Sequence, residues 1–199
     1  MRNLFDVLNE KFSTFYNPSE HLAVDEVTVK FKGRVIFRQY IPKKHKRFGI
    51  KIYKLCDETG YMYDMTVYLG RDRQRTAQHL TETHTTVSEL TKKIQRRGHK
   101  LYMDNYFSSP DFFDNLATKQ IYCCGTVRPS RKGMPQDLNP KRIILKRGDL
   151  QVRTRGDLTT MLWRDKRDVR ILTNIHDAQA GGNFCDNNGK TKTPQIVAD

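Results

Sequence analysis

The sequence predicts a mixed α/β fold, because three strand-like segments are followed by a helix, a fourth strand and a second helix. The chain has 199 residues, of which 37% are hydrophobic, and this is enough for one good-sized domain with a packed core. Apolar residues alternate with polar ones in the strand-like segments and recur every three or four positions in the helical segments.

The first half of the chain opens with a helical pattern over residues 4–15. A strand follows from Leu22, but its apolar alternation changes phase at Asp25, which predicts that the strand ends or bulges there. Two further strands are predicted over residues 48–56 and 61–69, joined by a turn. These consecutive strands indicate an antiparallel meander.

A helix is predicted over residues 75–95, followed by a short strand at 100–103 that ends in Asp104. Ser109 is a suitable N-cap for a second helix, and another strand is predicted over residues 121–127. Three strands, a crossover helix and a fourth strand resemble an RNase H-like core, a mixed sheet flanked by helices.

The second half of the chain has a different texture, rich in proline, glycine and basic residues. We therefore divide the chain into the first part of the core (residues 1–129), a β-rich insertion (130–180) and a loop that leads back to the core (181–199). Three short strands are expected in the insertion: residues 150–154, 159–163 and 169–173.

The charge balance indicates a polyanionic partner. The sequence has 36 Lys and Arg against 22 Asp and Glu, a net charge of +14. Nucleic acid is the first candidate, an anionic membrane surface the second, and a merely soluble basic surface the alternative. No apolar run is long enough to span a membrane. The candidate phosphate-binding residues are Lys30, Lys32, Arg34, Arg38, Lys43, Lys44, Arg128, Arg131 and Lys132.

The four cysteines show no C-x-x-C spacing, which disfavours a zinc site and favours a reduced, intracellular protein. With DNA as partner, the nucleus is the expected compartment. Trp163, the only tryptophan, is open to two interpretations, stacking on an unpaired base or packing in a core.

Two acidic residues are candidate metal ligands. Asp25 and Asp104 both follow predicted strands, and side chains at strand ends can converge on one site. Carboxylates hold Mg²⁺, and two such ions can activate a water and stabilise a leaving oxygen in phosphodiester cleavage. Each Asp alone could equally be an ordinary strand-end or turn residue. Glu26 is a further candidate, but in a continuous strand it points to the other face.

Several runs of residues resemble the piggyBac transposase family. Residues 24–34 (VDEVTVKFKGR) look like its first catalytic motif, and residues 101–109 (LYMDNYFSS) look like the second. Residues 125–135 (GTVRPSRKGMP) and the stretch from Trp163 are similar to later blocks. These blocks keep the family order and cover nearly the whole chain.

The resemblance implies a DDE/D transposase catalytic core that cuts and joins double-stranded DNA at transposon ends and target, with Mg²⁺ or Mn²⁺ as cofactor. It places Asp25 and Asp104 at the first two metal-binding acids. It also implies a third acid on a helix beyond Asp199, because residues 194–199 (PQIVAD) look like the run that precedes it. With two acids, we expect this chain alone to bind metal weakly and to cleave little. A homodimer is a further expectation.

Two alternatives remain at this point. The chain could be a domesticated, catalytically dead remnant that still binds DNA, and this hypothesis shares every residue with the enzyme hypothesis. An unrelated RNA-binding domain is less favoured, because the sequence contains no RNA-binding signature motif.

Overall fold

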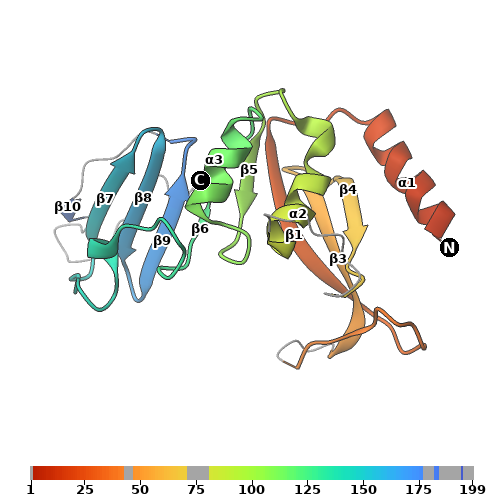
Figure 1. The fold of residues 1–199 in the computed structure, drawn as a ribbon, viewed down its shortest axis with the longest axis horizontal. Helices are drawn as coiled ribbons and strands as arrows, with labels where there is room; N and C mark the ends of the chain where they lie inside the picture. Colours follow the sequence, from red (N-terminus) through yellow and green to blue (C-terminus); the bar gives the residue numbers. More distant parts are fainter. Residues whose placement is uncertain (1, 43–46, 71–80, 177–181, 184–193, 195–199) are drawn as a thin grey trace. The chain divides into compact units, whose positions relative to one another are not determined.

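The computed structural model describes residues 2–42, 47–70, 81–176, 182–183 and 194. The chain forms two compact units, Met1–Leu101 and Tyr102–Asp199, which Figure 1 draws in sequence colours. None of the helices in the described part of the chain is long and apolar enough to cross a membrane.

The first unit contains a meander of antiparallel strands with helices. Strand β3 is its centre, because β1, β2 and β4 all pair with it in antiparallel fashion. The predicted meander is therefore confirmed, with β2 as an addition. The elements are α1 (Arg2–Phe15), β1 (His21–Lys30), β2 (Gln39–Tyr40), β3 (Phe48–Asp57), β4 (Met62–Val67), α2 (Glu82–Leu90), the 3-10 turn η2 (Lys92–Ile94) and the first half of β5 (Lys100–Met103).

Strand β1 continues straight through Asp25, so the predicted strand end or bulge at this residue is wrong. Its register with β3 is unbroken from the pair Leu22 and Asp57 to the pair Lys30 and Gly49. The phase change has another cause: Val27 is apolar but lies with Asp25 on the exposed face of the strand. Glu26 accordingly belongs to the opposite face.

The opposite face of this sheet is the buried one. Val24, Tyr53 and Leu55 are almost fully buried there. Helix α2 contacts β3 and β4 and buries Val87 and Leu90, so it covers this face (Figure 1). Burying these side chains supplies the hydrophobic stabilisation of the unit.

Helix α1 is attached by polar contacts and by an edge-on contact between the rings of Phe12 and Tyr61. The Asn9 amide donates to Asp64 Oδ1 over 2.7 Å and accepts from the Met65 N–H over 2.9 Å. Lys93 Nζ lies 3.0 Å from the other oxygen of Asp64, whose side chain is nearly buried. Leu8, an apolar residue within the helical pattern predicted over residues 4–15, is exposed.

Helix α2 ends earlier than predicted. The described helix stops at Leu90, and η2 follows, whereas a helix to residue 95 was expected. The Thr91 hydroxyl donates to the Val87 carbonyl over 2.8 Å, one of several threonine hydroxyls that bond to the preceding turn and compete with a regular helix end. The predicted start, residues 75–80, lies outside the described residues.

The second unit contains an antiparallel sheet in the order β10-β7-β8-β9-β6. The three strands predicted between residues 150 and 173 are confirmed within one or two residues, and so is strand β6. The predicted helix also begins after Ser109, which occupies its N-cap position, but the Ser109 side chain makes no capping hydrogen bond. The elements are the end of β5, α3 (Pro110–Ala117), β6 (Tyr122–Thr126), η3 (Gln136–Leu138), β7 (Asp149–Arg155), β8 (Leu158–Arg164), β9 (Asp168–Thr173) and β10 (Gly182–Asn183).

Trp163 belongs to the core of this second sheet. It packs with Leu150 and Met161, and Val152 and Val169 add partly buried contacts. Because the indole is buried, the core interpretation of Trp163 holds and base stacking by it is not supported.

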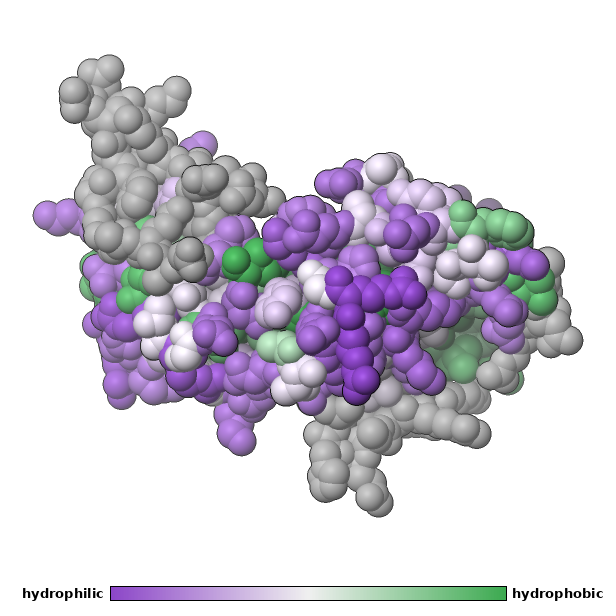
Figure 2. Space-filling view, turned by 90° about the horizontal axis from the view of Figure 1, so that it is seen from above, coloured by the Kyte–Doolittle hydropathy of each residue, from purple (hydrophilic) through white to green (hydrophobic). Residues whose placement is uncertain are grey.

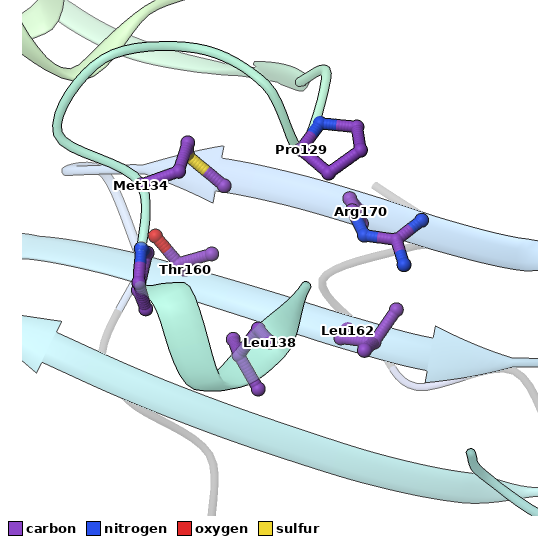
Figure 3. Close-up of a pocket in the computed structure, with 7 residues that line it drawn as sticks. Pro129, Met134, Leu138, Thr160, Leu162 and Arg170 are labelled. Carbon is purple, nitrogen blue, oxygen red and sulfur yellow. The ribbon is translucent and has the colours of Figure 1, made fainter. Parts of the chain in front are cut away.

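The segment between β6 and β7 folds over β8 and β9. Figure 3 shows Met134 and Leu138 of this segment around one pocket with Leu162 of β8 and Arg170 of β9. Met134 and Leu138 are buried, and the Arg170 guanidinium donates to Asp168 Oδ2 over 2.9 Å. The segment is therefore held against the sheet by apolar packing around a paired arginine.

Candidate functional site

Asp104 begins a tight loop directly after β5. Its carbonyl accepts from the backbone N–H groups of Phe107 and Ser108, each over 3.2 Å, and from the Ser108 hydroxyl over 2.9 Å. Its carboxylate oxygen Oδ1 accepts from the Tyr106 N–H over 2.9 Å. Phe107 and Ser108 are fully buried, whereas Asp104 is exposed. The loop thus fixes the carboxylate and presents it to solvent.

Gly125 of β6 lies directly behind this loop. A Cβ atom at this position would stand 2.2 Å from the Met103 carbonyl oxygen and 2.8 Å from the Ser108 hydroxyl oxygen. Both distances are far below ordinary contact, so only glycine lets β6 approach the end of β5 so closely. Gly125 therefore sets the position of the backbone that carries Asp104.

Two arginines donate hydrogen bonds to the same loop. Arg131 donates from one terminal nitrogen to the carbonyls of Asn105 over 3.1 Å and Tyr106 over 2.6 Å. Arg128 Nε donates to Asn105 Oδ1 over 3.0 Å. Burial and the nearby Arg128 lower the pKa of Arg131, while Tyr106 and Asp104 act in the opposite direction.

These bonds add a role that the sequence did not predict. Arg128 and Arg131 were predicted to contact DNA, and that contact stays a prediction for both. Nothing in the spacing of the two arginines indicates that they reach back to a loop more than 20 residues earlier, because only the fold brings the two segments together.

Asp25 lies on the exposed face of β1 in the first unit. Its Oδ1 accepts from the Glu26 N–H over 2.7 Å, and its cross-strand partner on β3 is Lys54. Cys56 lies on the same face, two residues along β3. Burial raises the pKa of the Cys56 thiol; Asp57 and Asp25 add to the effect and Lys54 opposes it, so the thiol stays neutral at physiological pH.

Asp25 and Asp104 share a local design. In each, one carboxylate oxygen accepts a backbone N–H while the residue remains exposed. Such hard oxygen donors fit Mg²⁺ or Mn²⁺. Within the described residues, no group of three or more His, Cys, Asp and Glu side chains is arranged to hold a metal ion.

Five of the predicted phosphate-binding residues, besides Arg128 and Arg131, lie in the described part of the chain. Lys30, Lys32, Arg34 and Arg38 are exposed at the end of β1 and on the segment that leads to β2, and Lys132 is exposed in the second unit. Lys43 and Lys44 lie outside the described residues. Among the described residues, hydrophilic side chains dominate the face seen in Figure 2.

The mixed α/β fold, with one exposed carboxylate on β1 and another directly after β5, is what we expect of the RNase H-like class of domains. The chain belongs to the DDE transposase family described as Transposase IS4, which matches residues 1–199, and it is of the piggyBac type.

One solved structure that this chain resembles is a cryo-EM structure of a piggyBac transposase synaptic complex with hairpin DNA. The match covers 99% of this chain and 40% of the transposase chain in that structure, with a TM-score of 0.84 and 30% sequence identity. This likeness confirms the predicted RNase H-like α/β fold and the predicted family.

Curated relatives include two human proteins. PiggyBac transposable element-derived protein 5 of Homo sapiens is 23% identical over 185 residues, which cover 86% of this chain and 35% of the relative. PiggyBac transposable element-derived protein 3 of Homo sapiens is 23% identical over 179 residues, 87% of this chain and 30% of the relative. The chain thus spans about a third of the length of these relatives.

Proposed function

We propose that this chain supplies the first two metal-binding acids, Asp25 and Asp104, to a transposase catalytic domain that cuts and joins DNA. The observation that carries the proposal is the Asp104 loop. Its carboxylate is exposed and oriented by the Tyr106 N–H, while Gly125 and Arg131 fix the backbone beneath it. Such bracing is what a metal ligand requires, because a ligand must be held close to its working geometry.

Asp25 and Asp104 would hold Mg²⁺ or Mn²⁺ through carboxylate oxygens. When bound, these ions supply an activated water and stabilise the leaving oxygen of a phosphodiester. The protein's own contribution is to orient each carboxylate with one backbone N–H and to leave the remainder open to solvent. A third acid is proposed beyond Asp199, from the family resemblance of the run that ends there.

The proposed partner is double-stranded DNA, both transposon ends and target. The exposed cations Lys30, Lys32, Arg34 and Arg38 would neutralise backbone phosphates largely without reading sequence. The related synaptic complex with hairpin DNA supports this choice. A homodimer and a nuclear location belong to the same proposal.

The metal site can be tested by NMR with Mn²⁺ as a paramagnetic probe. Substoichiometric Mn²⁺ should broaden amide signals around Asp25 and around Asp104 first, because relaxation falls steeply with distance. Asp25→Asn and Asp104→Asn should each remove the broadening near the altered residue. Asp157→Asn, at an exposed aspartate of the β7–β8 turn, is the matched control. Equal broadening in all variants would refute the assignment.

A strand-cleavage assay distinguishes the enzyme hypothesis from the hypothesis of a DNA-binding remnant. The assay uses a chain extended past Asp199 to include the proposed third acid. The enzyme proposal expects Mg²⁺-dependent nicking that Asp25→Asn abolishes. DNA binding without nicking would favour the remnant. For the 199-residue chain itself, we expect little cleavage, and robust cleavage would overturn the expectation that two acids are insufficient.

A further inference from the structure

We propose that Tyr40 and Phe48 form a stacking platform for an unpaired DNA base, at the base of a basic arm made of the described residues 30–42 and 47–51. The inference rests on the proposed function, since it takes DNA as the partner, and it adds a contact to bases where the cations provide contacts to phosphates. Figure 1 shows the arm, in orange, projecting where β1 ends and β3 begins.

The two rings come together because their strands pair. Tyr40 of β2 is the cross-strand partner of Phe48 of β3. The ring centroids are 4.7 Å apart with an interplanar angle of 34°, and the Arg38 guanidinium lies 5.1 Å from the Phe48 centroid. Arg38 also donates to the carbonyls of Lys32 and Gly33, each over 3.3 Å, which ties the arm into one structure.

The platform stays open to solvent despite these contacts. Tyr40 is 57% exposed and Phe48 47% exposed. Tyr53, an aromatic residue further along β3, is only 2% exposed and packs edge-on against Tyr68. The buried pair serves the core of the unit, whereas the Tyr40–Phe48 pair leaves aromatic surface for a ligand.

The charges around the rings select the ligand. Lys30, Lys32, Arg34 and Arg38 are exposed, and none of them forms an ion pair with a carboxylate of the described chain. A partner that is both polyanionic and rich in flat aromatic surface fits this combination, and nucleic acid has both properties.

The exposed faces of Tyr40 and Phe48 indicate that the ligand is an unpaired base rather than intact duplex DNA. In an intact duplex each base face is covered by its neighbours in the stack, so protein side chains contact base edges and phosphates unless the stack is opened. A base that has left the stack exposes its face and can lie on an aromatic ring, whatever its identity. The platform is therefore expected to distinguish unpaired from paired DNA and to tolerate any sequence.

The test measures binding of the 199-residue chain to three fluorescein-labelled DNAs by anisotropy: a mixed-sequence single strand of 12 nucleotides, the matching duplex, and a strand of equal length with abasic sites throughout. Tyr40→Leu and Phe48→Leu remove a ring but keep apolar bulk, and Tyr40→Phe keeps the ring. Phe15→Leu is the matched control, because Phe15 is 79% exposed and has Lys11 Nζ 5.5 Å from its ring centroid.

We expect Tyr40→Leu and Phe48→Leu to weaken single-strand binding by about fivefold or more. Tyr40→Phe and Phe15→Leu should stay within about twofold of the parent, as should every variant on the abasic strand and on the duplex. Far-UV circular dichroism should be unchanged.

Three outcomes would overturn the inference: unchanged single-strand binding in both Leu variants, an equal loss on the abasic strand, or an equal loss in Phe15→Leu. If the parent chain binds the duplex in a salt-dependent way while the Leu variants change nothing, only the platform is refuted. If the parent chain binds none of the three DNAs, the proposed function is refuted with it.

Discussion

Gly125→Ala is the substitution whose effect follows most directly from the structure. The added methyl group would stand 2.2 Å from the Met103 carbonyl oxygen, where ordinary contacts begin near 3.4 Å. Strand β6 must then move away from the end of β5 by about 1 Å, because neither the Met103 carbonyl nor the Ser108 hydroxyl is the flexible end of a long side chain. The strain falls on the backbone that leads into Asp104.

The expected cost is that of overpacking, about 1–3 kcal/mol in the free energy of unfolding. For a chain of this size, this corresponds to a fall in the melting temperature of about 2–12 °C. The displacement should also weaken the bonds that the Phe107 and Ser108 N–H groups donate to the Asp104 carbonyl. Their amide hydrogens should therefore exchange faster with solvent.

Thermal unfolding and hydrogen exchange measured by NMR test both effects. Gly98→Ala is the control: Gly98 has a positive φ of 76° and no atom within 4 Å of an added Cβ, so Ala strains only the local turn. This variant should lose stability but keep the protection of Phe107 and Ser108. The reasoning is refuted if Gly125→Ala melts like the parent chain and leaves the exchange of these two amides unchanged.

Three further predictions concern stability. Arg131→Ala should lower the unfolding free energy by about 1–3 kcal/mol, because two loop carbonyls lose a charged donor. Lys93→Met should cost about 1–2 kcal/mol in urea unfolding, since it leaves the nearly buried Asp64 without its cation. Acid should destabilise the first unit through Asp57. Burial acts to raise the pKa of this carboxyl, but the hydrogen bonds that it accepts, including those from the Thr59 side chain and backbone, outweigh burial and lower the pKa. The stability that Asp57 confers is present above its unfolded-state pKa near 4 and is lost as pH falls through the lowered folded-state pKa.

Each of these predictions has a matched comparison. Lys132→Ala and Lys92→Met alter exposed neighbours and should change stability by less than about 0.5 kcal/mol. Asp57→Asn should flatten the acid limb of a urea-midpoint profile between pH 4 and 2. Equal losses in the two lysine controls, or an acid limb that persists in Asp57→Asn, would contradict the respective argument.

The sequence predicted those elements whose signals are local. Strands β7, β8 and β9 are short segments that contain apolar residues and are separated by turn residues, and helix α3 has Ser109 at its N-cap position and Pro110 in its first turn, so their positions followed from nearest neighbours along the chain. The phase change in β1 was misread, because an apolar residue such as Val27 on an exposed face gives the same pattern as a bulge. Burial, not residue type, decides between the two.

The sequence predicted the two carboxylates of the candidate site but not the residues that hold the Asp104 loop in place. The positions of Asp25 and Asp104 near strands drew attention to both carboxylates, and the family resemblance assigned them a role. Gly125 and Arg131 could not be connected to Asp104, because their contacts depend on how β6 and the following loop pack against the end of β5. Such tertiary contacts leave no periodic signal in a single sequence.

Trp163 gives the chain a built-in optical label for one of its two units. It is the only tryptophan, and it is buried in the sheet of the unit Tyr102–Asp199. Its emission will report the melting of that sheet alone, whereas far-UV circular dichroism follows the backbone of the whole chain. Whether the two signals change together will show if the units Met1–Leu101 and Tyr102–Asp199 unfold as one cooperative body or in succession.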